Sequence, residues 1–222
     1  MIGSVDVAKT IGIIGGTGPE GKGLALRFAL AGLRVIIGSR EASRAAEAAS
    51  VVAPKAPAGS ITGALNADAA QAGIVVISVP YAAQKDTLEP LKASLEGKLV
   101  ISVVAPMTFA NGRAAAVAVP EGSAARQAQM LLPGSRIVAA FHNVSARDLL
   151  DPQRTVESDV VVCSDDGDAK QEVMALAELI PGVRAVNGGG LDNARYVEDL
   201  TSLLVNINRI YKAHSSIKFV GI

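Results

Sequence analysis

Short runs of apolar residues alternate along the chain with longer segments in which apolar side chains recur every three or four positions. The runs predict strands, because near-continuous β-branched stretches bounded by turn residues are typical of buried parallel strands. These strands are expected at residues 10–14, 35–38, 60–63, 74–79, 99–104 and 136–141. The periodic segments predict helices at about 24–30, 41–52, 67–72, 82–95 and 123–132. Such alternation predicts an α/β fold of the Rossmann type, with a doubly wound and mostly parallel sheet.

The last third of the chain continues this alternation less regularly. Strands are expected at 156–163 and 183–186, with a helix at 169–180 between them. After the triple glycine at 188–190, apolar residues at helical spacing predict one long helix from Leu191 to about His214, a small helical extension at the C-terminus. We interpret most polar residues of this helix as surface or cap residues; they are Asn193, Glu198, Asn206 and Asn208.

The residues that follow the predicted strands are expected to meet on one rim of the sheet, because ligands of doubly wound folds bind outside the carboxyl ends of the strands. They are Gly16, Ser39, Pro80-Tyr81, Ala105-Pro106 and His142-Asn143. The stretch from Met107 to Gly122 contains Asn111-Gly112 and Pro120-Glu121-Gly122, and is predicted to be a loop-rich insertion.

A glycine-rich turn follows the first predicted strand and opens the first helix. The pattern G-x-G-x-x-G is weak by itself, but the strand–turn–helix context is that of a dinucleotide site, where backbone N–H groups hold a pyrophosphate. The residues expected there are Gly16, Thr17, Gly18, Pro19, Glu20 and Gly21. Pro19 suits a first helical turn. Glu20 would repel a pyrophosphate unless its carboxylate points away, as a first-turn acid interacting with the helix dipole can.

The end of the second predicted strand indicates which dinucleotide is bound. An NAD site usually has Asp or Glu there to hold the ribose hydroxyls, whereas this chain has Gly38-Ser39-Arg40, with Arg44 one helical turn later. A hydroxyl and two guanidinium groups suit the 2′-phosphate of NADP, because arginine forms bidentate charge-assisted bonds with phosphate. We therefore predict an NADP site that includes Ser39, Arg40 and Arg44.

Composition and charge exclude several classes of function. Lysine plus arginine and aspartate plus glutamate number 21 each, so no net positive charge favours nucleic acid or a membrane surface. No apolar run is long enough to span a membrane, and residues 1–8 lack the features of a signal peptide. The only cysteine, Cys163, is expected to be buried and weakly favours a reducing, cytoplasmic location. The high apolar content, 50%, suggests a homodimer.

Several segments together resemble the NADPH-dependent reductases of coenzyme F420, an 8-hydroxy-5-deazaflavin. The resemblance covers nearly the whole chain, and the block from Gly15 to Ala25 is more specific than a bare glycine fingerprint. The other matching segments are Val35 to Arg40, Ser60 to Gly63, His142, Leu191 to Glu198 and Ile217 to Phe219. The resemblance implies an oxidoreductase that transfers a hydride reversibly between NADP(H) and F420. It also implies an NADP-binding domain at 9–145 and a smaller deazaflavin-binding and dimerisation region at 146–222, packed on the same core.

The same resemblance implies positions for the two rings. Tyr81, Ala105 and Ala146 would lie along the nicotinamide, and Pro106, His142, Val144 and Ser215 would border the deazaflavin. Ser215 departs from the family, which has leucine there. His142 could hydrogen-bond the deazaflavin or only fix its loop, and an essential proton-transfer role is not expected because hydride transfer needs no general base.

Two other functions stay open from the residues themselves. The chain could be an NADPH reductase of another acceptor, such as free flavin, a quinone or a ferric complex, or an NADP-binding sensor without catalysis. No His, Cys and carboxylate set with the spacing of metal ligands is found, so no metal is expected.

Overall fold

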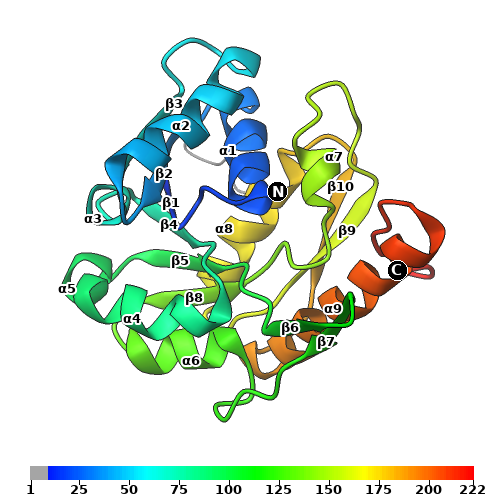
Figure 1. Cartoon of the computed structure of the whole chain (residues 1–222). Coiled ribbons are helices and arrows are strands. Elements are labelled where there is room, and N and C mark those ends of the chain that lie inside the picture. The colour runs from blue at the N-terminus through cyan, green and yellow to red at the C-terminus, as the bar shows by residue number, and fades with distance from the viewer. Residues whose placement is uncertain (1–9) are drawn as a thin grey trace.

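The computed structural model describes residues 10–222, so the expectation about residues 1–8 lies outside the described residues. Its centre is a six-stranded parallel sheet in the order β3-β2-β1-β4-β5-β8 (Figure 1), the doubly wound arrangement expected from the sequence. The strands are β1 (Thr10–Ile14), β2 (Arg34–Ser39), β3 (Ile61–Leu65), β4 (Ile74–Ile77), β5 (Leu99–Ser102) and β8 (Arg136–Ala139).

Helices cover both faces of this sheet and separate two apolar clusters. Ile11 and Ile13 of β1 pack into the first cluster, and Ile14, one residue further on, packs into the second. The first cluster contains residues of α1 (Pro19–Leu30), α2 (Ala42–Val52), α7 (Ala146–Leu149) and α8 (Gly167–Glu178). The second contains residues of α4 (Gln84–Leu88), η3 (Glu89–Leu91), α5 (Lys92–Leu95), α6 (Ala124–Leu131) and α9 (Ala194–Tyr211). Because helices cover both faces of the sheet, its strands are buried on both sides and read as continuous apolar runs.

A short second sheet extends the fold beyond β8. Strands β9 (Ser158–Val162) and β10 (Val183–Asn187) pair in parallel, and a single antiparallel bridge joins Ala139 of β8 to Cys163. The Cys163 side chain is fully buried, as expected, and burial raises the pKa of its thiol to about 11. Val160 and Val162 belong to the same apolar cluster as Ile11 and Ile13, so this C-terminal part shares a core with the large sheet.

The insertion after β5 differs from the expected loop. Residues Met107–Ala110 (β6) and Arg113–Ala116 (β7) form an antiparallel hairpin. Asn111 and Gly112 both have positive φ, +50° and +69°, which is the backbone of a two-residue type I′ turn. The pair Asn-Gly between two short runs was therefore a hairpin signal.

The polar residues of α9 are less exposed to solvent than the sequence suggested. Glu198 is buried and accepts hydrogen bonds from the backbone N–H groups of Ala124 and Ala125 at the start of α6, at 2.7 and 3.0 Å. The Asn206 side chain pairs with the backbone N–H and C=O of Ala114 in β7, at 2.9 and 2.8 Å. These residues of α9 therefore hold α6 and the hairpin in place, as Figure 1 shows for the position of β6 and β7 beside α9.

Three short helical segments complete the chain: α3 (Asn66–Ala69), η2 (Tyr81–Ala83) and η4 (Leu191–Asn193), with η1 (Ala53–Lys55) extending α2. Among residues 10–222, none of the helices combines the length and apolar character that crossing a bilayer requires.

Candidate functional site

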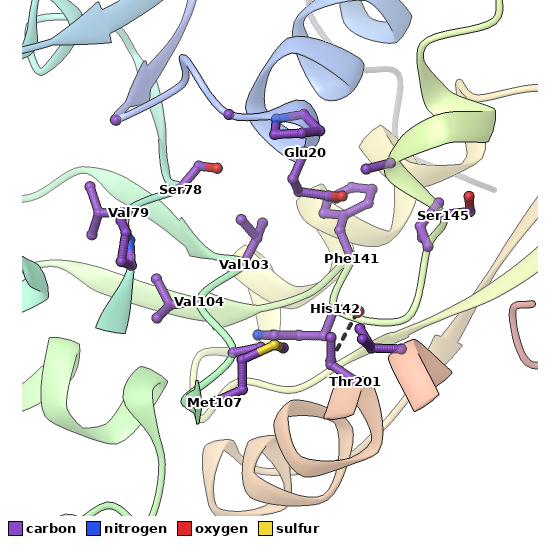
Figure 2. Close-up of a pocket in the computed structure, with 18 of the residues that line it drawn as sticks. Glu20, Ser78, Val79, Val103, Val104, Met107, Phe141, His142, Ser145 and Thr201 are labelled. Carbon is purple, nitrogen blue, oxygen red and sulfur yellow. Dashed lines mark hydrogen bonds between the residues drawn. The ribbon is translucent and has the colours of Figure 1, made fainter. Parts of the chain in front are cut away.

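A cavity of about 1010 Å³ opens at the carboxyl ends of the parallel strands, between the amino end of α1 and the inner face of α9 (Figure 2). Segments that follow β1, β2, β4, β5 and β8 all contribute to its lining, together with α7 and the residues after α9. This is the place at which doubly wound sheets bind ligands. Its volume lies at the upper end of the range for small-molecule and cofactor sites.

The glycine turn forms the upper wall of the cavity. Gly15 has a φ of +69° and donates its N–H to the side-chain oxygen of Asn66 at 3.0 Å. A Cβ atom on Gly21 would lie 2.5 Å from the Cα of Gly16, so these two residues pack backbone against backbone. Thr17 and Gly18 line the cavity, whereas Gly16 and Gly21 shape the turn behind it. The turn therefore presents backbone at the start of α1, with no side chain within 4 Å of a Cβ placed on Gly18.

Glu20 lies in the first turn of α1 and lines the same wall. Figure 2 shows its side chain extending from α1 into the cavity rather than away from it. The residue is partly exposed, but its Oε1 atom is buried and has no hydrogen-bond partner among the described residues. Burial raises the pKa of this carboxyl to about 8, which leaves it neutral at pH 7. The repulsion expected from a carboxylate beside the glycine turn is thereby removed.

The end of β2 supplies a polar corner. Ser39 is 8% exposed, and its hydroxyl accepts a hydrogen bond from the N–H of Glu41 at 3.3 Å. Arg40 and Arg44 are exposed and line the cavity beside Ser39. Among residues 10–222, neither arginine makes a salt bridge within 4.0 Å. Within the described part of the chain, no carboxylate at salt-bridge distance therefore competes with an anionic ligand for either guanidinium.

The middle of the cavity is apolar. Its lining side chains in Figure 2 include Val79, Val103, Val104, Met107 and Phe141. Phe141 has a φ of +68°, a left-handed conformation that is strained for an aromatic residue. Its ring packs edge-on against Phe28 of α1, with centroids 5.9 Å apart. This contact fixes the turn at the end of β8 and directs the next residue, His142, to the cavity.

His142 is 6% exposed and lines the apolar part of the cavity. Its backbone carbonyl accepts a hydrogen bond from the hydroxyl of Thr201 in α9 at 2.9 Å (Figure 2). Neither ring nitrogen has a hydrogen-bond partner of normal geometry in the described part of the chain. Burial lowers the pKa of the imidazole to about 4, which the nearby Val104 backbone offsets only in part. At pH 7 the cavity therefore contains a neutral imidazole with unsatisfied polar atoms, which a ligand could satisfy.

A buried arginine behind the cavity positions α7. Arg27 of α1 is 3% exposed and donates to four backbone carbonyls, those of Asp148, Leu149, Asp151 and Arg154, at 2.6 to 2.9 Å. Gly23 lets the two helices approach, because a Cβ there would lie 2.6 Å from the Cβ of Leu149. Ala146 and its neighbours are thereby held at a fixed position relative to the glycine turn.

Most of the residues predicted for the site meet in this one cavity. Those that line it are Thr17, Gly18, Pro19, Glu20, Ser39, Arg40, Arg44, Ala105, Ala146, His142, Val144 and Ser215. Gly16 and Gly21 lie behind the turn, and Tyr81 and Pro106 also fall outside the lining. The Tyr81 hydroxyl instead accepts a hydrogen bond from Gln127 at 3.2 Å, and the Pro106 carbonyl accepts one from the N–H of Val117 at 3.0 Å. Both residues follow strand ends, but these hydrogen bonds hold them beside the cavity and outside its lining.

Several lining residues were not predicted. They include Asn66, Arg147, Thr201, Leu204, Asn208, Lys212 and His214. Asn66 has a usable signal, since a polar residue at a strand end can fix the neighbouring glycine turn. The others come from α7, α9 and the turn after α9, and their distance along the sequence from the glycine turn hides them. Among residues 10–222, no group of three or more His, Cys, Asp or Glu is arranged to hold a metal ion.

Comparison with known proteins identifies the family of this chain. The family model described as "NADP oxidoreductase coenzyme F420-dependent" matches residues 10–106, which contain the glycine turn and the end of β2. A curated F420-dependent NADP reductase of Methanothermobacter thermautotrophicus is 46% identical over 205 residues, covering 89% of this chain and 88% of the relative.

Two further relatives extend the match over the whole fold. The F420-dependent NADP reductase of Methanocaldococcus jannaschii is 40% identical over 210 residues, and the match covers 91% of this chain and 94% of the relative. A crystal structure from Arthrobacter sp. FB24, assigned provisionally to the F420-dependent NADP reductases, superimposes with a TM-score of 0.82. It is 25% identical and covers 96% of this chain and 99% of that one. On this evidence, the chain belongs to the F420-dependent NADP reductase family.

Proposed function

We propose that this protein catalyses reversible hydride transfer between NADP(H) and the deazaflavin coenzyme F420. The observation that carries the proposal is one cavity that combines a basic corner, an exposed backbone turn and an apolar centre. The relatives named above are reductases of these two compounds, and the three surfaces suit the phosphate, the pyrophosphate and the ring of NADP.

The NADP end is assigned to β1, β2 and the starts of the helices after them. The turn from Thr17 to Glu20 holds the pyrophosphate through backbone N–H groups at the start of α1. Ser39, Arg40 and Arg44 hold the 2′-phosphate, which NAD lacks. Neutral Glu20 fits this position, because a buried carboxylate there would oppose the pyrophosphate charge.

The centre of the cavity is assigned to the two rings. NADPH supplies a hydride to the deazaflavin, or NADP⁺ takes one from it, and transfer needs the two reacting carbons at about 3–3.5 Å. Ala105 and Ala146 leave space beside the nicotinamide, and Val144 and Met107 exclude water from the acceptor side. His142 donates to or accepts from a polar edge of the acceptor ring through its unsatisfied nitrogens. These side chains orient the rings and do not transfer protons, since no general base is required.

The decisive experiment mixes NADPH with the protein and oxidised F420 in a stopped-flow instrument, with free flavin mononucleotide as a parallel acceptor. The proposal predicts rapid loss of the visible absorption band of the deazaflavin and little flavin reduction. Faster reduction of the flavin would instead identify a reductase of another acceptor. Tight NADPH binding without reduction of any acceptor would identify a sensor.

We further propose that the chain functions as a homodimer in the cytoplasm, with residues 9–145 binding NADP and residues 146–222 forming the acceptor side and the subunit contact. The support for a subunit contact is an apolar stripe on the outer face of α9. Tyr196, Leu203 and Ile210 are 67%, 55% and 72% exposed. They are seven residues apart, and each step of seven residues rotates the position by only about 20° around the helix. The three side chains therefore lie on one face of α9. A second copy of this stripe would cover it.

A further inference from the structure

The cavity has a second basic end, formed by Arg147, Lys212 and His214. Arg147 comes from α7, and the other two residues follow or end α9. All three line the cavity beside Ser215, on the side assigned to the acceptor. The assignment of NADP to the opposite side leaves these three residues without a role.

The two basic ends come from different elements of the fold. Arg40 follows β2, whereas Arg147 follows β8, and β1, β4 and β5 lie between these two strands in the sheet. Arg147 belongs to α7, and its guanidinium bonds His214 in the turn after α9 at 3.1 Å. The 2′-phosphate assigned to Ser39, Arg40 and Arg44 therefore leaves the second end for a different anionic group.

The backbone of this second end is fixed. Lys212 is the C-cap of α9 and has a φ of +51°, a left-handed conformation that turns the chain back towards the cavity. The side chain of Asn208 accepts a hydrogen bond from the hydroxyl of Ser215 at 2.7 Å and holds that turn closed. On the other side, the four carbonyl bonds of Arg27 fix the segment that carries Arg147.

The charge at this end is only partly balanced. Asp148 is the one described carboxylate that bonds to the cluster, and it is already bound by Arg154 at 3.2 Å and by Nδ1 of His214 at 3.3 Å. Nε2 of the same imidazole lies 3.1 Å from Nη1 of Arg147, so the ring of His214 holds this guanidinium in place between the two helices. Neither Arg147 nor Lys212 has a carboxylate within salt-bridge distance among residues 10–222.

We infer that Arg147, Lys212 and His214 form a subsite for the anionic side chain of the electron acceptor. The inference rests on the proposed function, because it assigns the apolar centre to the acceptor ring. F420 carries a phosphodiester followed by glutamate residues, whereas riboflavin or a quinone has no such anionic group. The planar guanidinium of Arg147 suits a phosphate through paired N–H donors, and the Lys212 ammonium adds a mobile charge at the exposed rim. This subsite selects an acceptor with an anionic tail over the same ring without one.

The test uses the whole enzyme and three forms of the acceptor. They are intact F420, a form that ends at the phosphodiester, and the tail-less 8-hydroxy-5-deazaflavin. With NADPH as donor, R147Q/K212Q should raise the KM for intact F420 by about ten- to a hundredfold, as expected for two lost charge-assisted contacts. The KM for the tail-less form, kcat, and the dissociation constant for NADPH should stay unchanged.

Matched controls separate this effect from a general loss of charge. Arg34 lies at the opposite end of β2 and Lys92 lies in α5; both are exposed and neither lines the cavity. R34Q/K92Q should leave every KM unchanged. The form that ends at the phosphodiester identifies the bound anion: a full effect of R147Q/K212Q on this form assigns the subsite to phosphate, and an effect only on intact F420 assigns it to the glutamates.

Equal KM changes for the tailed and tail-less forms, or no change for either, would overturn the subsite. A wild-type enzyme that reduces none of the three forms would contradict the proposed function instead. In that case calorimetric binding of intact F420 and of the tail-less form still decides the inference. R147Q/K212Q should then weaken binding of the intact form and leave binding of the tail-less form unchanged. A wild type that does not bind the intact form, no weakening in the variant, or an equal loss for both forms would overturn the subsite.

Discussion

Arg40 illustrates how one side chain can decide the choice between two dinucleotides. It is exposed, lines the cavity next to Ser39, and makes no salt bridge with any residue from 10 to 222. Because its proposed partner is the 2′-phosphate, Arg40→Ala should raise the dissociation constant for NADPH by about ten- to a hundredfold and leave that for NADH nearly unchanged. Fluorescence titration of both nucleotides measures this difference.

The control for this prediction is Arg34→Ala, which removes an exposed arginine from the other end of the same strand. It should alter neither dissociation constant. Equal weakening of NADPH and NADH in Arg40→Ala would remove this arginine from the 2′-phosphate site.

Glu20 leads to a prediction about pH. Its carboxyl has a pKa of about 8 because of burial, so it is neutral at pH 7 and ionises as the pH rises through 8. The new charge would oppose the pyrophosphate, and the affinity for NADPH should therefore fall by about tenfold between about pH 7 and about pH 9. In Glu20→Gln, which stays neutral, this part of the pH dependence should vanish.

Titrating NADPH into both proteins across this range isolates the contribution of Glu20, since ionisation of the nucleotide itself affects both equally. Glu41→Gln, an exposed acid outside the cavity lining, is the control and should behave as the wild type. Identical pH profiles for the wild type and Glu20→Gln would show that the carboxyl does not face the pyrophosphate.

The contact between α9 and α6 should make stability depend on pH. Glu198 is 1% exposed, and burial raises the pKa of its carboxyl from 4.5 to about 7, although two backbone N–H bonds favour the charged form. The unfolded chain would release this proton near pH 4.5 and the folded chain only near pH 7. The contribution of protonated Glu198 to the free energy of unfolding is therefore full below pH 4.5 and is lost as the pH rises to about 7. For a shift of this size, this loss amounts to about 3 kcal/mol.

Chemical denaturation of the wild type and of Glu198→Gln at a series of pH values measures this effect. The free energy of unfolding of the wild type should fall across this range by more than that of the variant. Glu47→Gln, an exposed residue of α2, should follow the wild type. Parallel curves for Glu198→Gln and the wild type would indicate that the buried carboxyl has an ordinary pKa.

The order of the elements could be predicted from the sequence because each strand of a parallel sheet is buried on both faces. The run 74–79 is apolar for that reason, and β4 lies at Ile74–Ile77 between β1 and β5. The hairpin at 107–116 was missed because its strands are short and mostly exposed, and therefore lack an apolar pattern. Only the Asn-Gly turn marks it.

The predictable part of the site is the part that lies close together in sequence. The glycine turn and the Ser39-Arg40 pair both follow strands within the first forty residues, so a local motif and its spacing identify them. Arg147, Thr201 and His214 reach the same cavity from α7, α9 and the turn after it, through tertiary packing that no local pattern encodes. The burial of Glu198 likewise depends on α6, more than seventy positions earlier in the chain.

The two faces of α9 connect the cavity to the outer surface of the molecule. Thr201 and Leu204 line the cavity, whereas Leu203 points to the outer face and is 55% exposed. If a second copy covers this outer face, Leu203→Lys should convert the protein from a dimer to a monomer, because an unpaired charge would be buried in the contact. Light scattering after gel filtration should then give 22.6 kDa for the variant and twice this mass for the wild type.

Val51→Lys is the matched control, since Val51 of α2 is also half exposed, at 50%, and α2 packs on the opposite face of the sheet from α9 (Figure 1). It should remain dimeric. A wild type of 22.6 kDa, or a Leu203→Lys variant that stays dimeric, would exclude the stripe on α9 as the subunit contact. Because this helix also forms the wall of the cavity, loss of the dimer should loosen that wall and raise the KM for the acceptor more than that for NADPH, whose proposed contacts come from β1, β2 and α1.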